Sequence, residues 1–264
     1  MDRRRSSWPL GLLTLILAPV AAAMLLYQLD PYDPAPVPIH EFSQQPMVVP
    51  KLNSRMLQGS EMIGVGKLLG PEDIAYHPDS HLIYTGCDDG WVKRVTLNDC
   101  RTGLSPEDDP SASLSAVTVS WSSLMPKRKR CLKYHIQGER KGFMDKFIDN
   151  LLGTPDNILY DGERDYWIAL PMGNSLAWDL ALKYPWIRKV VAIMERYKVR
   201  PHMEKNGGVL VVDLEGNPTA YYYDPGLSEV TTGVKIGNNL YCGSITAPYM
   251  IRLDLHQHVV RATM

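Results

Sequence analysis

The sequence predicts an all-β fold, and more narrowly a β-propeller, from its composition, its turn residues and an internal repeat. The chain has 264 residues, 45% hydrophobic and 22% charged, which is an ordinary globular composition. Fourteen Tyr and six Trp favour strands over bundled helices, and 20 Gly and 20 Pro divide the chain into many short strands. The formal net charge of −1 gives no support for a nucleic-acid partner, which would require a basic patch.

The internal repeat is a six-residue unit that occurs at Pro71–Tyr76 and again at Pro155–Tyr160. A turn and an apolar strand follow each copy, at His81–Gly86 in the first case and Asp165–Leu170 in the second. Leu240–Gly243 echoes the first of these strands and indicates a third, weaker copy. A repeated strand–turn–strand unit is typical of propeller blades.

The N-terminus predicts entry into the secretory pathway. Arg3–Arg5 precede Trp8–Tyr27, a stretch without a charged residue and long enough to cross a bilayer as a helix. The basic cluster should stay cytoplasmic and send the chain after Asp30 to the lumenal side. Ala21–Ala23 could instead mark cleavage of a signal peptide, although the apolar run continues past it. Residues 1–29 are therefore predicted as a signal anchor or a signal peptide.

A proline-rich linker at residues 30–60 is expected to separate this segment from a β domain at residues 61–264. Short apolar runs between turns predict the strands of that domain. They are Ile74–Tyr76, His81–Gly86, Trp91–Leu97, Cys131–Gln137, Phe143–Ile148, Ile158–Tyr160, Tyr166–Leu170, Val209–Asp213, Ala220–Tyr223, Val234–Ile236, Leu240–Gly243 and Met250–Leu255.

Two segments of the domain break the strand pattern. Residues 99–129 are rich in Ser and Pro and show no clear periodicity, and they lead into the basic run Lys127–Arg130. Such a run is typical of a solvated loop, and a nuclear-localisation reading conflicts with the N-terminal signal. Residues 174–200 form a helical insert in which Pro185 is expected to begin a second helix.

The helical insert is predicted to be amphipathic. Its apolar face comprises Leu176, Leu180, Trp186, Val190, Ile193 and Tyr197. Its polar face carries Lys183, Arg188, Lys189, Arg196 and Lys198. The insert either packs as a cap on one end of the β domain or contacts an anionic membrane surface.

The four cysteines, Cys87, Cys100, Cys131 and Cys242, are widely spaced and match no metal-binding pattern. One or two disulfides in an oxidising compartment and buried free thiols are both compatible with this spacing.

Several long motifs carry a resemblance to a known family. They are Gly70–Tyr76, Tyr84–Cys87 with Asp89–Val95, Pro155–Gly162, Trp178–Pro185, His202–Gly208 and Leu240–Ser244. Together they resemble the plant strictosidine synthase-like family, to whose group the animal adipocyte plasma membrane-associated protein belongs.

The resemblance implies a six-bladed β-propeller of the endoplasmic reticulum or vacuole, behind an N-terminal signal or anchor. It covers Glu61–Asn98 and Arg130–Leu255. Family members carry several blades where this chain has Asp99–Lys129, so we expect an incomplete or strained propeller with exposed strand edges. A splicing variant, a gene-model error or an inactive truncated product would each explain such a gap.

Strictosidine synthase, a carbon–nitrogen lyase, condenses an amine with an aldehyde and uses a glutamate as general base. The resemblance places Thr231 or a neighbour at that glutamate's position, with Glu229 two residues away. An even offset along a strand keeps the face but moves the side chain by about 7 Å. Strictosidine synthase activity is therefore not expected.

The similar paraoxonase and lactonase propellers hold a central calcium ion in a ring of Glu, Asp and Asn oxygens. Glu72, Asp156 and Asn157 match three of those ligand positions. Hard oxygen ligands suit calcium, which would polarise the carbonyl of a small ester or lactone substrate. No histidine is assignable as a catalytic base, because His77, His81 and His202 lie at turns or in the insert. The simpler alternative is that the three residues only cap turns at the starts of strands.

The competing function class is non-enzymatic. Absence of the catalytic glutamate and of half the metal ring favours a membrane-anchored lumenal binding module. Calcium-dependent ester hydrolysis by the purified protein distinguishes the two classes.

Overall fold

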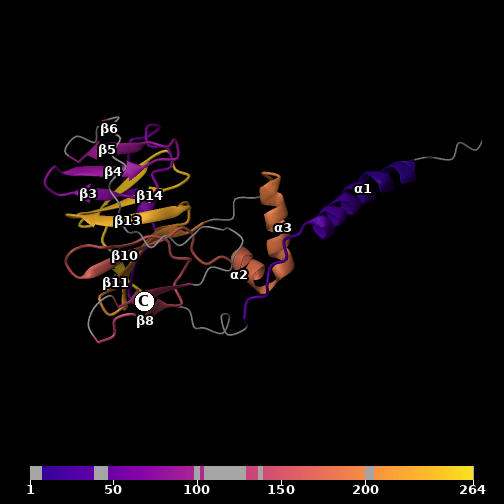
Figure 1. Ribbon diagram of the computed structural model, residues 1–264. Coiled ribbons are helices and arrows are strands. Elements are labelled where there is room, and N and C mark those ends of the chain that lie inside the picture. Colours follow the sequence, from indigo (N-terminus) through magenta and orange to yellow (C-terminus); the bar gives the residue numbers. More distant parts are fainter. Residues whose placement is uncertain are drawn as a thin grey trace, which may run out of the picture. The chain divides into compact units, whose positions relative to one another are not determined.

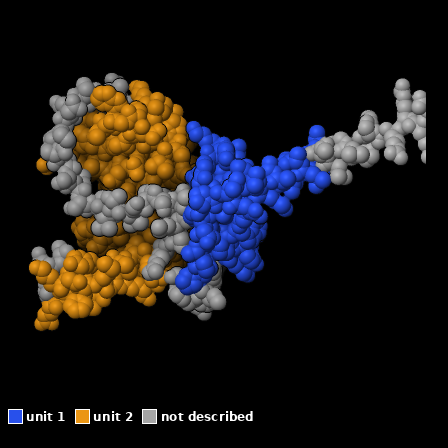
Figure 2. All heavy atoms as spheres, turned by 45° about the vertical axis from the view of Figure 1, so that its right-hand side comes forward, with its two compact units in different colours: residues 1–42, 122–126, 176–202 blue, residues 43–121, 127–175, 203–264 orange. Residues whose placement is uncertain are grey.

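The computed structural model describes residues 8–38, 47–97, 102–103, 129–135, 139–199 and 205–263, and most of the regular elements in them are β-strands, as predicted (Figure 1). The chain divides into two compact units (Figure 2). A helical unit contains residues 1–42, 122–126 and 176–202, and a β unit contains residues 43–121, 127–175 and 203–264.

Three four-stranded meanders make up most of the β unit (Figure 1). The first consists of β3 (Ala75–His77), β4 (Leu82–Gly86), β5 (Val92–Thr96) and β6 (Thr102–Gly103). The second consists of β9 (Ile158–Tyr160), β10 (Asp165–Leu170), β11 (Gly207–Asp213) and β12 (Pro218–Asp224). The third consists of β13 (Val230–Ile236), β14 (Asn239–Ser244), β15 (Met250–Asp254) and β2 (Ser60–Ile63). Four antiparallel strands, in sequential order apart from β2, are consistent with propeller blades.

The internal repeat is confirmed as a structural repeat. The two copies of the six-residue unit lead into β3 and β9, and the apolar strands that follow them are β4 and β10. The third copy, in β14, occupies the same second position of its own meander. Predicted boundaries differ from the observed ones by one or two residues for most strands, but β13 begins at Val230 rather than Val234.

Residues far apart in the chain complete two of the sheets. β2, from the N-terminal part, pairs with β15 and so supplies the outer strand of the third meander. β1 (Lys51–Asn53) pairs in parallel with β12, and β16 (Arg261–Ala262) pairs with β1. With the 3-10 helix η2 (Met56–Gly59), β1 lies within residues 30–60, which the sequence predicted as linker. The backbone groups of β1 pair with the edge of an existing sheet, so β1 can form a strand without an alternating apolar pattern in its own sequence.

A separate hairpin of β7 (Arg130–Tyr134) and β8 (Met144–Asp149) precedes the second meander. β7 ends three residues before the predicted strand end, Gln137. Of the atypical residues 99–129, only 102–103 and 129 belong to the described part of the chain, so the prediction for the others lies outside it.

The core lies on both faces of the second meander. Side chains alternate across a strand, and in β11 Val209 and Val211 pack in one apolar cluster while Leu210 and Val212 pack in another. All four are at most 4% exposed, and burial of each contributes roughly 1.5–3 kcal/mol. A third cluster, which includes Ile83, Val95, Ile236 and Tyr241, packs the first meander against the third.

The helical unit contains α1 (Trp8–Leu29), α2 (Leu176–Lys183) and α3 (Pro185–Arg196). α1 covers the predicted apolar stretch, and Pro185 begins a second helix in the insert, as expected. Among the residues whose side chains are described, no helix combines the length and the apolarity that a bilayer crossing requires.

The predicted apolar face of the insert exists, but it is exposed instead of buried. Trp186 is 58% exposed and Tyr197 is 56% exposed, and Leu176, Leu180 and Val190 are exposed as well. The residues that α2 and α3 bury are Ala181, Arg188 and Ala192. Arg188, which the sequence analysis placed on the polar face, is buried because backbone carbonyls accept its hydrogen bonds.

Three of the four cysteines are described, Cys87, Cys131 and Cys242, and all three are free thiols. Cys242 is buried and the other two are partly buried. Cys100 lies outside the described residues.

Candidate metal centre

The two copies of the repeated unit place their acidic residues in equivalent positions. The backbone N–H of Glu72 donates to the carbonyl of Gly86, at the end of β4, with a distance of 3.0 Å. The N–H of Asp156 donates in the same way to the carbonyl of Ala169 in β10, at 2.9 Å. Each residue therefore lies just before the first strand of its meander and is hydrogen-bonded through its backbone to the second strand.

Thr231 brings these two positions together. Its side-chain hydroxyl donates a 2.5 Å hydrogen bond to the backbone carbonyl of Glu72. Its own carbonyl accepts a 3.2 Å hydrogen bond from the backbone N–H of Asn157. The first strands of all three meanders, β3, β9 and β13, consequently begin near one another, with the predicted ligand residues at their starts.

An irregularity in β13 explains how Thr231 reaches both neighbours. The pairing of β13 with β14 shifts register between Val230 and Thr232, so Thr231 is an extra residue in the ladder. A bulge of this kind leaves one residue unpaired and turns it out of the regular pleat. The backbone carbonyl of Thr231 can then accept the hydrogen bond from Asn157 of the neighbouring meander.

Close backbone approach fixes the segment that carries Glu72. A Cβ on Gly243 of β14 would lie 2.3 Å from the carbonyl oxygen of Pro71, which only glycine tolerates. Gly70 has a φ of +58°, and a Cβ there would lie 2.6 Å from the carbonyl oxygen of Ile245. The backbone of the Gly70–Glu72 segment is thus in close contact with the third meander.

The three predicted ligands carry the type of oxygen atom that calcium binds, but they supply only part of its coordination shell. Glu72 is exposed, and Asp156 and Asn157 are half-buried, which leaves the site open to solvent. Two carboxylates and one amide are hard oxygen ligands, whereas calcium takes six to eight. Within the described residues, no group of three or more His, Cys, Asp and Glu side chains could hold a metal. The metal assignment rests on these three residues and stays a prediction.

Glu229 does not lie on the strand that the sequence analysis assumed. It precedes β13 by one residue and has a φ of +53°. Its N–H donates to the carbonyl of Pro171 at 2.7 Å, which holds this left-handed backbone in place. The offset argument along a regular strand therefore does not apply, because Glu229 has a left-handed backbone and a bulge follows it at Thr231.

His77 and His81 lie at a turn, as the sequence analysis stated. His77 and His81 flank the β3–β4 turn, at the opposite end of β3 from Glu72. They hydrogen-bond to Ser80 and Tyr76, respectively. His202 lies outside the described residues.

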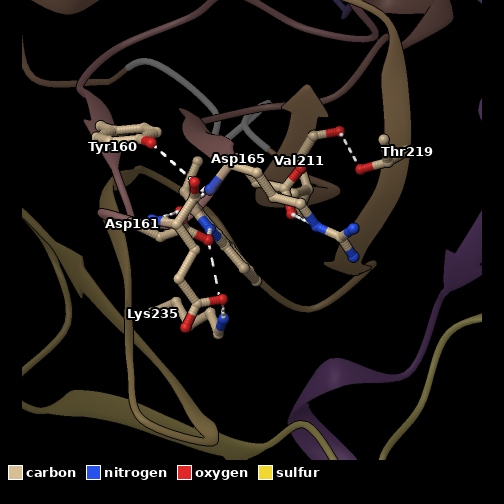
Figure 3. Close-up of polar contacts among 9 residues, drawn as sticks. Tyr160, Asp161, Asp165, Val211, Thr219 and Lys235 are labelled. Carbon is tan, nitrogen blue, oxygen red and sulfur yellow. Dashed lines mark hydrogen bonds and ion pairs between the residues drawn. The ribbon is translucent and has the colours of Figure 1, made fainter. Parts of the chain in front are cut away.

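A second polar cluster surrounds Asp161, at the other end of β9 (Figure 3). The carboxylate of Asp161 is 1% exposed and accepts hydrogen bonds from three backbone N–H groups, those of Glu163, Arg164 and Asp165. The indole N–H of Trp167 donates to it as well, at 3.3 Å.

Burial opposes ionisation of Asp161, but the hydrogen bonds outweigh it, so the pKa of this carboxyl is lowered. Lys235 of β13 lies 3.8 Å from the Asp161 carboxylate and 2.8 Å from that of Glu163. Every donor is part of a turn or a neighbouring strand, so this cluster holds the β9–β10 turn and joins two meanders.

The sequence analysis did not identify Thr231 as the residue that joins the predicted ligands. Thr231 and Glu72 are 159 residues apart, and no local pattern signals a hydrogen bond across that separation. For the cluster at Asp161, the sequence contains a partial signal. The Asp161–Gly162 pair after β9 is typical of a turn.

Taken together, the meanders and the hydrogen bonds of Thr231 are consistent with a propeller-like β protein. Residues 53–95 match the family model described as "Strictosidine synthase-like, N-terminal". Protein STRICTOSIDINE SYNTHASE-LIKE 6 of Arabidopsis thaliana is 35% identical, over 91% of this chain and 94% of that protein. The chain belongs to the strictosidine synthase-like family.

Two further relatives agree with this assignment. Protein STRICTOSIDINE SYNTHASE-LIKE 7 of Arabidopsis thaliana is 33% identical, over 93% of this chain and 95% of that protein. The adipocyte plasma membrane-associated protein of Gallus gallus is 31% identical, over 49% of this chain and 33% of that protein.

The alignment lengths agree with an internal gap. The alignment with the first of these relatives runs over 351 positions, although this chain has only 264 residues. The relative therefore contains positions that have no counterpart in this chain.

Proposed function

We propose that this chain is a membrane-anchored, lumenal strictosidine synthase-like protein built on a six-bladed propeller that lacks its middle blades. Three observations support this proposal. The described strands form one six-stranded sheet, two four-stranded sheets and a hairpin, the alignment with a relative exceeds this chain in length, and β2, from the N-terminal part of the chain, pairs with β15 of the last meander.

The anchor is proposed from the sequence of the N-terminus. Trp8–Tyr27 contains no charged residue and follows Arg3–Arg5, the order of a signal anchor with a cytoplasmic N-terminus. The name of the Gallus gallus relative describes that protein as plasma membrane-associated. A secretory address, in the endoplasmic reticulum or the vacuole, follows from the same signal.

We further propose that Glu72, Asp156 and Asn157 bind calcium and that the site hydrolyses a small ester or lactone. The observation that carries this proposal is the pair of hydrogen bonds made by Thr231, which joins the backbones of Glu72 and Asn157. Three oxygen-bearing side chains from two repeats are thereby held at the start of adjacent strands.

The site residues would have different roles, as metal ligands or as a positioning residue. The carboxylates of Glu72 and Asp156 supply negative charge, and the amide oxygen of Asn157 supplies a neutral donor. A bound calcium ion would polarise the carbonyl of the substrate. Thr231 is a positioning residue, because its hydroxyl and carbonyl engage backbone atoms of the other segments. The exposed position of Glu72 leaves the site accessible to a small molecule.

Calcium binding and ester turnover test this function on the full chain in detergent. Isothermal titration should detect calcium binding, and Glu72→Gln and Asp156→Asn should each weaken it at least tenfold. Asp79→Asn is the matched control, because Asp79 is also an exposed carboxylate but lies in the β3–β4 turn, at the opposite end of β3 from Glu72. Aryl-ester turnover should require calcium and disappear in the double variant.

Absence of calcium binding and of turnover would overturn the hydrolase proposal, as would turnover retained in the double variant. The second candidate function, a non-catalytic binding module, is favoured by the residue at the lyase position. Thr231 stands there, and its hydroxyl is occupied by the carbonyl of Glu72. An inactive truncated product would show neither calcium binding nor cooperative unfolding.

A further inference from the structure

Helix α3 exposes apolar side chains and buries a charged one. Its apolar side chains Trp186, Val190 and Tyr197 recur at helical spacing and are exposed. Its buried residues are Arg188 and Ala192, on the other side of the helix. A helix of a globular domain normally buries its apolar stripe, so the exposed stripe requires an apolar environment of its own.

Part of the polar side of α3 is bonded inside the helical unit. The guanidinium of Arg188, which is 7% exposed, donates to the carbonyl of Ala181 at 3.1 Å and to that of Ala35 at 2.5 Å. Arg196 forms a 2.7 Å ion pair with Asp30, whose side chain is 5% exposed. The ammonium of Lys189 lies 4.8 Å from the ring centroid of Tyr27. These contacts fix which face of α3 points outward.

The same contacts connect α3 to the C-terminal end of α1. Tyr27 lies in the last turn of α1, and Asp30 follows its final residue, Leu29. If α1 lies in a bilayer, as proposed above, its C-terminal end is at the lumenal headgroup layer. α3 is then held at the same depth by the ion pair and by the cation–π contact.

We propose that the exposed apolar face of α3 lies on the lumenal surface of the membrane that α1 enters. This inference rests on the proposed membrane insertion of α1. Trp and Tyr are the side chains that prefer the interface between headgroups and acyl chains, and Trp186, Tyr184 and Tyr197 supply them here. Lys183 and Lys198 are exposed basic side chains of the same segment, and their charge favours anionic lipid.

Quenching of Trp186 by brominated lipid tests the contact. The full chain would be reconstituted in vesicles of phosphatidylcholine and phosphatidylserine, with and without bromine on the acyl chains. The emission lost in Trp186→Phe reports on Trp186 alone, and we expect bromine to quench most of it. Trp91 is the matched control, since it is 53% exposed and lies in the β unit. The emission lost in Trp91→Phe should be insensitive to bromine.

A second variant and a flotation assay separate the possible failures. Val190→Asp places a charge on an exposed position of the apolar face, so the chain should still fold and float with the vesicles while Trp186 loses its quenching. A chain that floats with Trp186 unquenched overturns this inference and leaves the anchor standing. A chain that does not float overturns the anchor and this inference together.

Discussion

The hydroxyl of Thr231 donates a 2.5 Å hydrogen bond to the backbone carbonyl of Glu72, which lies 159 residues earlier in the chain. This bond joins the third meander to the start of the first, next to two of the predicted calcium ligands. Thr232, the next residue, is also buried, at 0% exposed, but its hydroxyl has no hydrogen-bond partner among the described residues. Two adjacent threonines therefore have opposite energetic roles.

We expect Thr231→Val to destabilise the protein and Thr232→Val to leave it unchanged or to stabilise it. Loss of the Thr231 hydroxyl removes one hydrogen bond, at a cost of about 0.5–1.5 kcal/mol. Loss of the Thr232 hydroxyl removes a buried polar group that is unsatisfied, which lowers the cost of folding. Urea unfolding of both variants, followed by tryptophan fluorescence, measures the difference. Equal destabilisation by the two substitutions would contradict the assigned roles.

Gly243→Ala should disturb the segment that carries Glu72. A Cβ at this position would lie 2.3 Å from the carbonyl oxygen of Pro71, and backbone cannot move aside as a flexible side chain can. We expect a loss of about 1–3 kcal/mol in the free energy of unfolding, together with weaker calcium binding. Gly86→Ala in β4 is the control, because a Cβ there would meet no atom within 4 Å and should have little effect.

Asp161→Ala should cost stability in a pH-dependent way. Four N–H groups donate to this buried carboxylate, and their loss should cost about 2–3 kcal/mol at pH 7. The folded-state pKa of Asp161 is lowered, so its contribution is present above the unfolded-state pKa of about 3.9. It is lost as the pH falls through the folded-state pKa.

Chemical unfolding of the wild type and of Asp161→Ala between pH 7 and pH 3 measures this dependence. The two stability curves should converge at the acid end. Asp79→Ala in the exposed β3–β4 turn is the control and should follow the wild type throughout. A constant offset between wild type and Asp161→Ala at every pH would argue against the ionised form as the acceptor.

Cys131 should resist alkylation in the folded protein. Burial raises the pKa of its thiol to about 11, so little thiolate, the reactive form, is present at pH 8. Iodoacetamide labelling followed by mass spectrometry should show slow reaction in the native state and fast reaction in urea without reductant. A site that remains unlabelled in urea would indicate a disulfide instead of a free thiol.

The repeat made the fold class predictable, because a blade is a local structure. Its strands are adjacent in sequence and alternate apolar with turn residues, so β3–β5, β9–β10 and β14 were all recognisable. β1, β2 and β16 were less so, since their pairing partners lie far along the chain and their own patterns are short. The same limit applied to the start of β13, where Thr231–Gly233 have no strand-like alternation.

The candidate site was predictable as a set of residues but not as an arrangement. Glu72, Asp156 and Asn157 were assigned from the family resemblance, and the structure shows the equivalent backbone bonds of Glu72 and Asp156. The sequence analysis identified the two faces of the insert helix but not which of them is buried. Periodicity finds an apolar stripe, but only the tertiary contacts of Arg188 and Arg196 decide which side of the helix is buried.

The sequence by itself determined the all-β class, the repeat, the N-terminal apolar segment and the family, because each is encoded in residues that are close together in the chain. The tertiary structure alone decided that Thr231 joins Glu72 to Asn157 and that α3 turns its apolar face outward. The physical reason is the same in both cases. Hydrogen bonds and ion pairs between distant segments form only where the folded backbone brings those segments together, and local residue patterns do not encode which segments meet.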